Sequence, residues 1–436
     1  MALTRLLGFP LGFPLVSRLV DTPLSTSGYS ALWDFVNRIY IGGSPLSFSR
    51  SSDATYFDNT GTLQTASAGS LRFDHDPVTL APRGILIEGA RTNAIRNPRC
   101  EGASAGSPGI TPTHWNGNWS GTGLTREIVG RTTVNGMECI DIRVYGTASA
   151  AVANILYFDD TSGVLAAATG QAVTASCFAQ MLSFIGPSDV TVTLVLREDN
   201  GGSFLRQSMV DLKSAATLTR IANTVTCGAS TTGAAAGARI GAASGASFDF
   251  TIRIGLPQLE LGAFASSPIR PPVSSPASVT RATDLLTTAV GGWFNPSEGT
   301  WVVASSRPYA DATDTFPRVL QIDDGTNNNR LVIGWATLSS NLRAESIVSG
   351  TNQCLLGESA SQTSASTIAF SYKANDFAAS VNGGAAATDT SGSVPTGLTT
   401  VRFGSRVNDL QLFGHIRRVS CIPRRVSNAE LQVLST

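Results

Sequence analysis

Short runs in which apolar and polar residues alternate cover most of this chain, and such runs predict β-strands. In residues 138–144 (ECIDIRV) apolar and polar residues alternate with a period of two, as a half-buried strand requires. Because Gly, Asn, Asp and Ser separate the runs, we predict an antiparallel sandwich here. Its predicted strands are 137–145, 172–182, 190–197, 217–227 and 248–261.

A second antiparallel sandwich is predicted in the C-terminal third. Residues 323–330 (DDGTNNNR) and 382–384 (NGG) are its predicted hairpin turns. Ser427 is placed to cap a short final helix, with Glu430 at the capping-box position. The predicted strands are 299–305, 318–322, 330–335, 366–373, 376–381, 400–403 and 414–422.

Four segments depart from this pattern. Residues 29–40 have an apolar spacing that fits one short helix. The Ala/Gly tract 231–246 lacks large apolar residues, which predicts a loop on either side of a short strand near 239–240. Residues 268–276 contain four prolines and are predicted to be a linker.

Residues 6–20 are apolar, but prolines break any helix there and the stretch is too short to span a bilayer. An apolar terminus usually docks, so we expect it to anchor the chain to a partner protein or to other copies, through Leu7, Phe9, Leu11 and Phe13.

Composition limits the classes of function. Charged residues make up 14% of the chain, and 31 basic groups balance 31 acidic ones, so neither nucleic-acid binding nor membrane insertion is indicated. A low-charge surface rich in Ser, Thr and Asn suits an extracellular particle or large subunit contacts. The six cysteines form no C-x-x-C pair, and we expect buried free thiols rather than a zinc site.

Residues 48–93 form a row of short extended pieces broken by turn signals. Within it, residues 50–58 (RSSDATYFD), 72–77 (RFDHDP) and 84–88 (GILIE) resemble a segment of tailed-bacteriophage structural proteins of the tail-fibre and spike type, as do residues 279–284 (VTRATD). The resemblance implies a homotrimer on the virion surface, assembled in the host cytoplasm and bound to other virion proteins through its N-terminus.

The two predicted sandwiches have resemblances of their own. Residues 97–102 (NPRCEG) resemble the opening of carbohydrate-binding-module jelly rolls, and residues 256–267 resemble the end of the phage version. Residues 414–431 resemble the ending of concanavalin-like lectin and laminin-G sandwiches. In many carbohydrate modules a last-strand Asp joins an early Glu in a structural calcium site. Here residues 255–257 (GLP) replace that Asp, which leaves Glu101 as a lone candidate ligand.

We therefore predict an all-β fold with two antiparallel β-sandwiches, jelly-roll-like and then concanavalin-like, after an extended anchoring segment. The predicted divisions are a docking peptide with a short helix (1–47), a connector (48–96), the first sandwich (97–267), a linker (268–284) and the second sandwich (285–436).

Trp115 and Trp119, with Asn116 and Asn118, supply the chemistry of saccharide binding on a Gly/Asn-rich loop, where aromatic faces lie beside hydrogen-bonding amides. The alternative is that one or both tryptophans close the sandwich core, because large aromatics are mostly buried.

Other kinds of site have less support in the sequence. Asp323 and Asp324 superficially resemble a calcium loop but lack its distal Glu, so a solvated turn is favoured and no cofactor is required. The adjacent acids at 159–160 and 198–199 point apart on an extended chain and do not pre-form a glycosidase pair. No P-loop, dinucleotide fingerprint or nucleophile elbow occurs.

The resulting hypothesis is a virion adhesin, a tail fibre or spike, that attaches to a host-surface polysaccharide through loops of its sandwiches. Two alternatives remain: a glycan depolymerase acting through paired carboxylates, and an architectural decoration or adaptor protein that contacts only other virion proteins.

Overall fold

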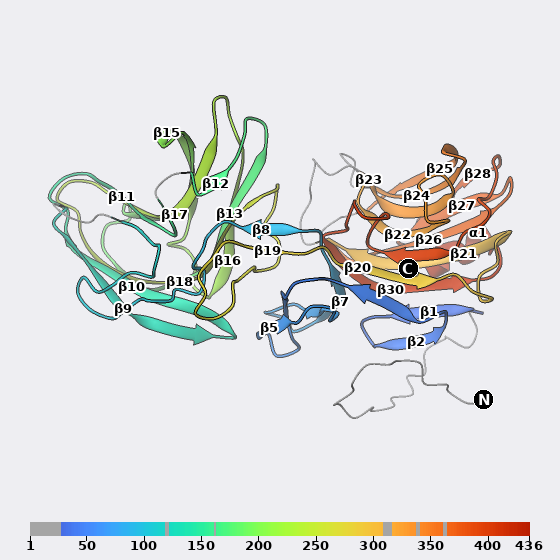
Figure 1. The fold of residues 1–436 in the computed structure, drawn as a ribbon, viewed down its shortest axis with the longest axis horizontal. Coiled ribbons are helices and arrows are strands. Elements are labelled where there is room, and N and C mark those ends of the chain that lie inside the picture. Colours follow the sequence, from blue (N-terminus) through green and yellow to red (C-terminus); the bar gives the residue numbers. More distant parts are fainter. Residues whose placement is uncertain (1–27, 118–121, 161–162, 308–315, 337–340, 361–363) are drawn as a thin grey trace. The chain divides into compact units, whose positions relative to one another are not determined.

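A computed structural model describes residues 28–117, 122–160, 163–307, 316–336, 341–360 and 364–436, and it confirms the all-β prediction. Apart from one short helix, α1 (Asn428–Leu434), the regular elements of these residues are strands in antiparallel sheets. The chain divides into two compact units (Figure 1). The central unit comprises Ser52–Ser67 and Ala90–Ala282. The terminal unit comprises the described residues of Met1–Ser51 together with Ala68–Gly89 and Thr283–Thr436.

The central unit is a sandwich of two antiparallel sheets. The first contains, in spatial order, β16 (Thr219–Thr226), β13 (Ala172–Ile185), β18 (Ser247–Leu261), β10 (Met137–Thr147) and β9 (Leu124–Val134). The second contains β11 (Val152–Tyr157), β17 (Gly233–Ala242), β14 (Thr191–Asn200) and β15 (Ser203–Asp211), with β12 (Leu165–Ala166) also on β17. Two short pairs complete the unit: β4 (Ala54–Phe57) with β5 (Leu63–Ala66), and β8 (Arg91–Asn93) with β19 (Val279–Arg281).

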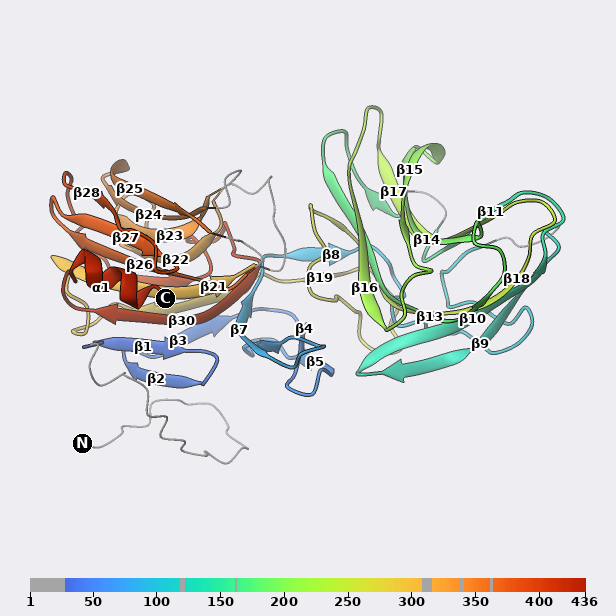
Figure 2. The same ribbon diagram turned by 180° about the vertical axis from the view of Figure 1, so that it is seen from behind.

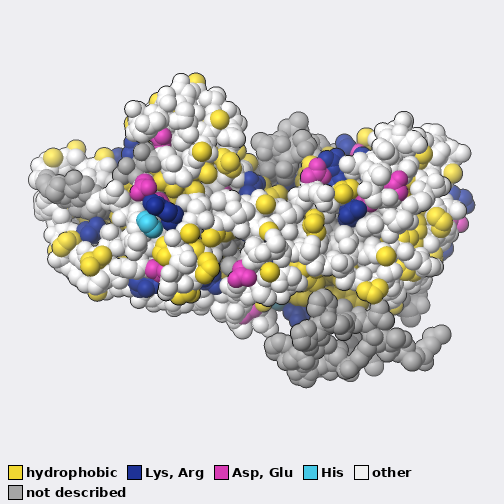
Figure 3. All heavy atoms as spheres, in the orientation of Figure 1, with side chains coloured by type: hydrophobic (Ala, Val, Ile, Leu, Met, Phe, Trp, Pro, Cys, Tyr) yellow, Lys and Arg dark blue, Asp and Glu magenta, His cyan; other side chains and the backbone are white. Residues whose placement is uncertain are grey.

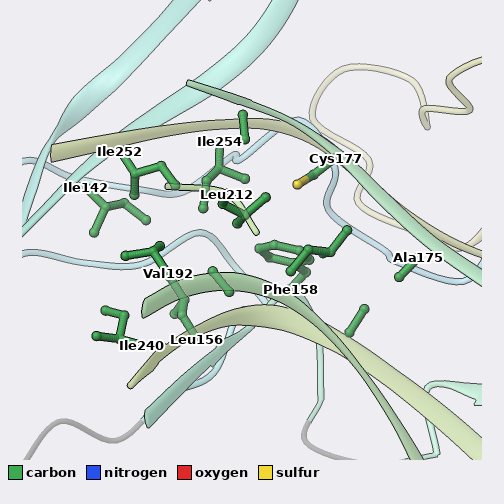
Figure 4. Close-up of a cluster of buried hydrophobic side chains, with 14 of the residues drawn as sticks. Ile142, Leu156, Phe158, Ala175, Cys177, Val192, Leu212, Ile240, Ile252 and Ile254 are labelled. Atoms are coloured by element: carbon green, nitrogen blue, oxygen red, sulfur yellow. The ribbon is translucent and has the colours of Figure 1, made fainter. Parts of the chain in front are cut away.

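The core of the central unit lies between these two sheets. In Figure 4, Ile142 and Ile252 of the first sheet point toward Val192, Leu156 and Ile240 of the second. All five side chains are buried, because alternate residues of each strand face inward.

The Ala/Gly tract is where the sequence prediction is wrong. Instead of loops around a short strand, it forms β17, which pairs with both β11 and β14 inside the sheet. Ala234 and Ala236 are buried in the core beside large residues such as Phe158 and Leu196. Small side chains suit this strand because its neighbours supply the bulk that fills the core.

The terminal unit is a second sandwich. One sheet runs β2 (Ile39–Gly42), β1 (Ala31–Asp34), β30 (Gly414–Ile422), β21 (Glu298–Ser306), β26 (Ser366–Lys373), β27 (Phe377–Val381) and β28 (Ala387–Asp389), and β7 (Pro82–Ile87) joins β30 and β6 (Phe73–His75). The other runs β25 (Thr351–Ser359), β24 (Asn341–Val348), β23 (Arg330–Ala336), β22 (Arg318–Asp323), β29 (Thr400–Phe403), β20 (Leu285–Ala289) and β3 (Leu46–Ser49).

The helix predicted over 29–40 is also wrong, because this segment forms the hairpin β1–β2. β1 pairs along β30, and Figures 1 and 2 both show the two strands side by side. Ala31 and Trp33, two positions apart, are both buried in the core, which is the period of a strand. Arg38, at a φ of 57°, makes the turn.

The predicted divisions of the chain differ from the observed units. Residues 48–96 are not a separate connector, since 52–67 and 90–96 belong to the central unit and 68–89 to the terminal unit. The C-terminal sandwich does not begin at residue 285 either, because strands β1, β3 and β7 complete its sheets. The predicted linker is packed on the central unit, where the Pro271 carbonyl accepts a hydrogen bond from Arg99 Nε at 2.6 Å and Ile269 is buried.

Several local predictions are confirmed. The two hairpin turns connect β22 to β23 and β27 to β28. The Ser427 side chain caps α1 by accepting a hydrogen bond from the Glu430 backbone N–H at 3.2 Å. All six cysteines are buried free thiols.

No helix among the described residues is long and apolar enough to cross a membrane. Figure 3 shows a surface on which charged side chains are sparse, in keeping with the composition.

Candidate functional site

The structure separates the members of the predicted saccharide-binding loop. Trp115 is 5% exposed, its ring lies 4.9 Å from that of Phe158, and its Nε1 donates a hydrogen bond to the Asn97 carbonyl at 3.1 Å. Trp115 therefore belongs to the core, as the alternative interpretation expected. Asn116 is exposed, and Asn118 and Trp119 lie outside the described residues.

Asn116 leads to a second group of candidate residues on the outer face of the sheet β11–β17–β14–β15. Its backbone forms a bridge with Tyr157 of β11, with N···O distances of 3.1 and 2.7 Å. Residues opposite each other in an antiparallel pair share a face, so both side chains lie on the face away from Trp115. Across the sheet, Tyr157 is opposite Gly237 of β17, and Gly237 is opposite Val195 of β14.

The strand β17 gives this face a floor of small residues. Gly233, Ala235 and Gly237 occupy successive outward positions. A Cβ at Gly237 would lie 2.5 Å from the Leu156 carbonyl oxygen, so the two backbones approach too closely for a larger residue. All three positions are buried.

Arg197 of β14 is opposite Ala235 of β17, and its guanidinium lies between two aromatic rings. Its guanidinium carbon is 5.5 Å from the ring centroid of Tyr157 and 4.5 Å from that of Phe204. Phe204 is 49% exposed, whereas Tyr157 is mostly buried. Burial lowers the pKa of Arg197, and the charge of Asp199 offsets this effect only in part. Among the described residues, no carboxylate lies within ion-pair distance of Arg197, so its N–H groups are available to a ligand.

Together these residues, which we call the Arg197 face (Asn116, Tyr157, Arg197, Phe204 and Gln207), combine the two elements of saccharide recognition. The ring of Phe204 offers an apolar surface on which a sugar can stack. Asn116, Gln207 and the Arg197 guanidinium offer hydrogen-bonding groups for hydroxyls.

The adjacent acids in this unit hold structural positions. Asp159 accepts hydrogen bonds from Arg96, whose guanidinium also reaches Asp160 at 2.9 Å. Glu198 accepts from Arg206 and from the Thr231 hydroxyl, and Asp199 accepts from the Gly163 N–H. Each carboxylate is therefore held by hydrogen bonds to neighbouring residues, as expected for acids that stabilise turns and strand ends.

The candidate calcium ligands also have protein partners. Glu101 accepts a hydrogen bond from the Ser274 N–H at 2.9 Å. Asp323 is buried and accepts two hydrogen bonds from Arg402, while Asp324 accepts from Thr326 and Asn329 in the turn. In the part of the chain that the structure describes, no three His, Cys, Asp or Glu residues come together as a metal site. The predicted anchoring residues Leu7, Phe9, Leu11 and Phe13 lie outside that part.

The phage-like phrases converge on a buried ionic network in the terminal unit. Asp284 Oδ1 accepts a hydrogen bond from Arg50 at 3.0 Å, and Asp284 Oδ2 accepts from Arg72 and from the Glu88 N–H. Glu88 in turn accepts from Arg72 at 2.7 Å. A further phrase residue, Asp74, lies 2.7 Å from Nε2 of His415 on β30. One charged residue from each of the four phrases, namely Arg50, Arg72, Glu88 and Asp284, therefore contributes to a buried network within the terminal unit.

Comparisons with known proteins add similarities but show no family. No protein-family model matches the chain, and no curated protein matches its sequence. Among solved structures, it is similar to the tripod from the baseplate of bacteriophage Tuc2009, at 13% identity and a TM-score of 0.31, over 76% of this chain and 98% of that one. It is also similar to the CBM40 of a Ruminococcus gnavus sialidase bound to α2,3 sialyllactose, at 17% identity and a TM-score of 0.28, over 33% and 84% of the two chains. A third similarity, at 11% identity and a TM-score of 0.28, is to domain 4 of a Geobacillus stearothermophilus arabinanase in complex with arabinotriose, over 40% and 81%. Scores this low carry no conclusion about function.

Sequence reasoning missed Tyr157, Arg197 and Phe204. One signal was present, since Arg197 is the last residue of a predicted strand that is otherwise uncharged, at a position whose side chain faces outward. Its two aromatic neighbours could not be assigned, because they lie on strands that the sequence did not reveal.

Proposed function

We propose that this chain is a structural protein of a tailed bacteriophage or a phage-like particle, and that it binds a host-surface saccharide through the Arg197 face. The observation that carries the proposal is Arg197 itself, a guanidinium held between Tyr157 and the exposed Phe204, with no carboxylate of the described residues within ion-pair distance. The assignment to a phage particle is supported by the phage-like phrases, whose charged residues form buried ion pairs in the terminal unit.

In this proposal the protein is a tail fibre or spike at the virion surface. Its N-terminal residues attach it to other virion proteins, and it forms a homotrimer. Several copies per particle then multiply a modest affinity at each site. We propose binding without catalysis, because the acids near the Arg197 face are engaged in structural hydrogen bonds.

The test is binding of the purified full chain to host cells and to an array of host-type glycans. Phe204→Ser removes the exposed ring, and Arg197→Gln removes the charge and the fork of donors. Each should reduce binding by roughly 5- to 150-fold, since aromatic contacts and hydrogen bonds to charged groups are each worth about 1–3 kcal/mol. The matched control is Ile185→Ser, which removes an exposed apolar side chain from the other sheet of the same unit.

The outcomes separate the three hypotheses. Binding that Phe204→Ser and Arg197→Gln lower and Ile185→Ser leaves unchanged supports an adhesin. Release of reducing ends from the glycan would show a depolymerase. Absence of binding to cells and glycans would favour an architectural protein and reject the proposal.

A further inference from the structure

A second cluster of polar residues lies in the terminal unit, on the outer face of strands β22, β23 and β24. There Arg318 is opposite Gly334, which is opposite Arg343, and in the next row Val332 is opposite Glu345. Phe316 packs on Val332 and Ile347 in a small apolar cluster separate from the main core. The side chains of these rows therefore lie on the face turned away from the sandwich interior.

Positive charge exceeds negative charge in this cluster. We call the following residues the arginine cluster: Arg318, Arg330, Arg343, Arg402 and Arg406, with Asp323, Glu345 and Asp409. Arg343 pairs with Glu345, Arg402 with Asp323 and Arg406 with Asp409. Among the described residues, Arg318 and Arg330 have no carboxylate within ion-pair distance, so two positive charges are unpaired.

Burial makes this excess unusual. Arg318 is 3% exposed, and its Nη1 donates a hydrogen bond to the Phe316 carbonyl at 3.0 Å. The Nε atoms of Arg318, Arg330 and Arg343 are buried without a hydrogen-bond partner in the described part of the chain. A buried N–H without a partner is costly, and a buried charge without one is costlier still.

The effect on ionisation agrees with the geometry. Burial lowers the pKa of Arg318 to about 9; Glu345 opposes this shift, and the neighbouring Arg330, Arg406 and Arg343 add to it. Burial also lowers the pKa of Arg330. An anion placed among these guanidinium groups would remove that penalty.

The cluster is also pre-organised. The guanidinium carbons of Arg318 and Arg343 each lie 4.1 Å from the ring centroid of Phe316, which fixes both side chains. Fixed guanidinium forks match the oxygens of carboxylates and phosphates, and little entropy is lost when they bind.

The geometry points to an anion-binding site on the outer face of β22–β24, in which Arg318, Arg330 and Arg343 hold a carboxylate or phosphate group; that a saccharide carries this group rests on the proposed function. The site is in a different unit from the Arg197 face and does not depend on that face. The two sources of an oxyanion, an acidic sugar and a phosphorylated one, share this chemistry.

The test measures binding to the full chain by calorimetry at constant ionic strength. The probes are polygalacturonate for the carboxylate, inorganic phosphate for the phosphate, and dextran as the neutral control. Arg330→Gln is the chief variant, because it removes an unpaired charge without breaking an ion pair. Its matched control is Arg418→Gln, which removes an arginine from β30 in the other sheet of the same unit.

We expect at least one anionic probe to bind and dextran not to bind. Arg330→Gln should weaken that binding at least roughly tenfold, the lower range for a hydrogen bond to a charged group, while Arg418→Gln leaves it unchanged. Glu345→Gln, which adds to the positive excess, should tighten it. Binding of one probe alone identifies the oxyanion. The proposal is wrong if neither anion binds, as when a carboxylate of the chain itself fills the site, or if the two arginine variants behave alike.

Discussion

The buried network around Asp284 allows the sharpest test of how the terminal unit is held together. The side chains of Asp284, Arg50 and Arg72 are fully buried, and that of Glu88 is 5% exposed. Burial alone would lower the pKa of Arg72, but Asp284 and Glu88 reverse this effect and hold it above its ordinary value. The carboxylates therefore more than offset the desolvation of that guanidinium.

The perturbation is Asp284→Asn, which keeps the shape of the side chain and removes its charge. Arg50 and Arg72 would then each lose an ion pair with Asp284, while the pair between Arg72 and Glu88 would remain. The new amide N–H group would also face donors, since Oδ1 and Oδ2 both accept hydrogen bonds in the native network. Removing one partner of a buried ion pair costs about 3–5 kcal/mol, which lowers the melting temperature of a unit this size by roughly 6–20 °C.

The assay is thermal unfolding followed by tryptophan fluorescence, because Trp33, Trp301 and Trp335 are buried in the terminal unit. Glu298→Gln is the control: it breaks the largely exposed pair with Lys373 in the same unit and should cost about 0–1 kcal/mol. A double-mutant cycle with Arg50→Leu should give a coupling energy of at least about 1 kcal/mol. A loss below about 1 kcal/mol for Asp284→Asn would refute the reasoning, because the charge would then contribute no more than a surface pair.

Two further predictions concern single turns and contacts. Hydrogen bonds from the Thr79 and Val78 N–H groups and from Arg83 lower the pKa of Asp76 to about 2. This stability is complete above the unfolded-state pKa of about 4 and is lost as pH falls through about 2. Asp76→Asn should therefore cost about 1 kcal/mol at neutral pH, a value reduced for partial exposure, and the difference from the native chain in urea unfolding should vanish near pH 2. Gly237→Ala places a Cβ against the Leu156 carbonyl and should destabilise the central unit by about 1–3 kcal/mol, whereas Gly292→Ala, in open space, should change the melting temperature little; equal effects would contradict the close approach of β11 and β17.

The sequence predicted strands wherever alternation was strong, and it failed where tertiary packing decides. Residues 138–144 need only their own period to be assigned. The tract 233–242 becomes a strand because large neighbours fill the space that its alanines leave, and no local signal carries that information. In residues 29–40 the apolar positions fit two periods, and pairing along β30, nearly 400 residues away in the chain, selects the strand.

The candidate sites show why residue roles were harder to predict than the fold. The phrase residues Arg50 and Asp284 meet across 234 positions of sequence, so their pairing depends on the topology of the whole sandwich. Trp115 fails as a surface residue because it and Asn116 point to opposite faces, and the bridge to Tyr157 decides which of them faces the core. In the sequence, Arg197 is the last residue of one predicted strand and Arg318 is the first residue of another, and neither position indicates a binding role. They become candidate binding groups because an aromatic ring packs on each guanidinium and because, in the described part of the chain, no carboxylate lies within ion-pair distance of either one. These contacts depend on the folded arrangement, which a single sequence does not display.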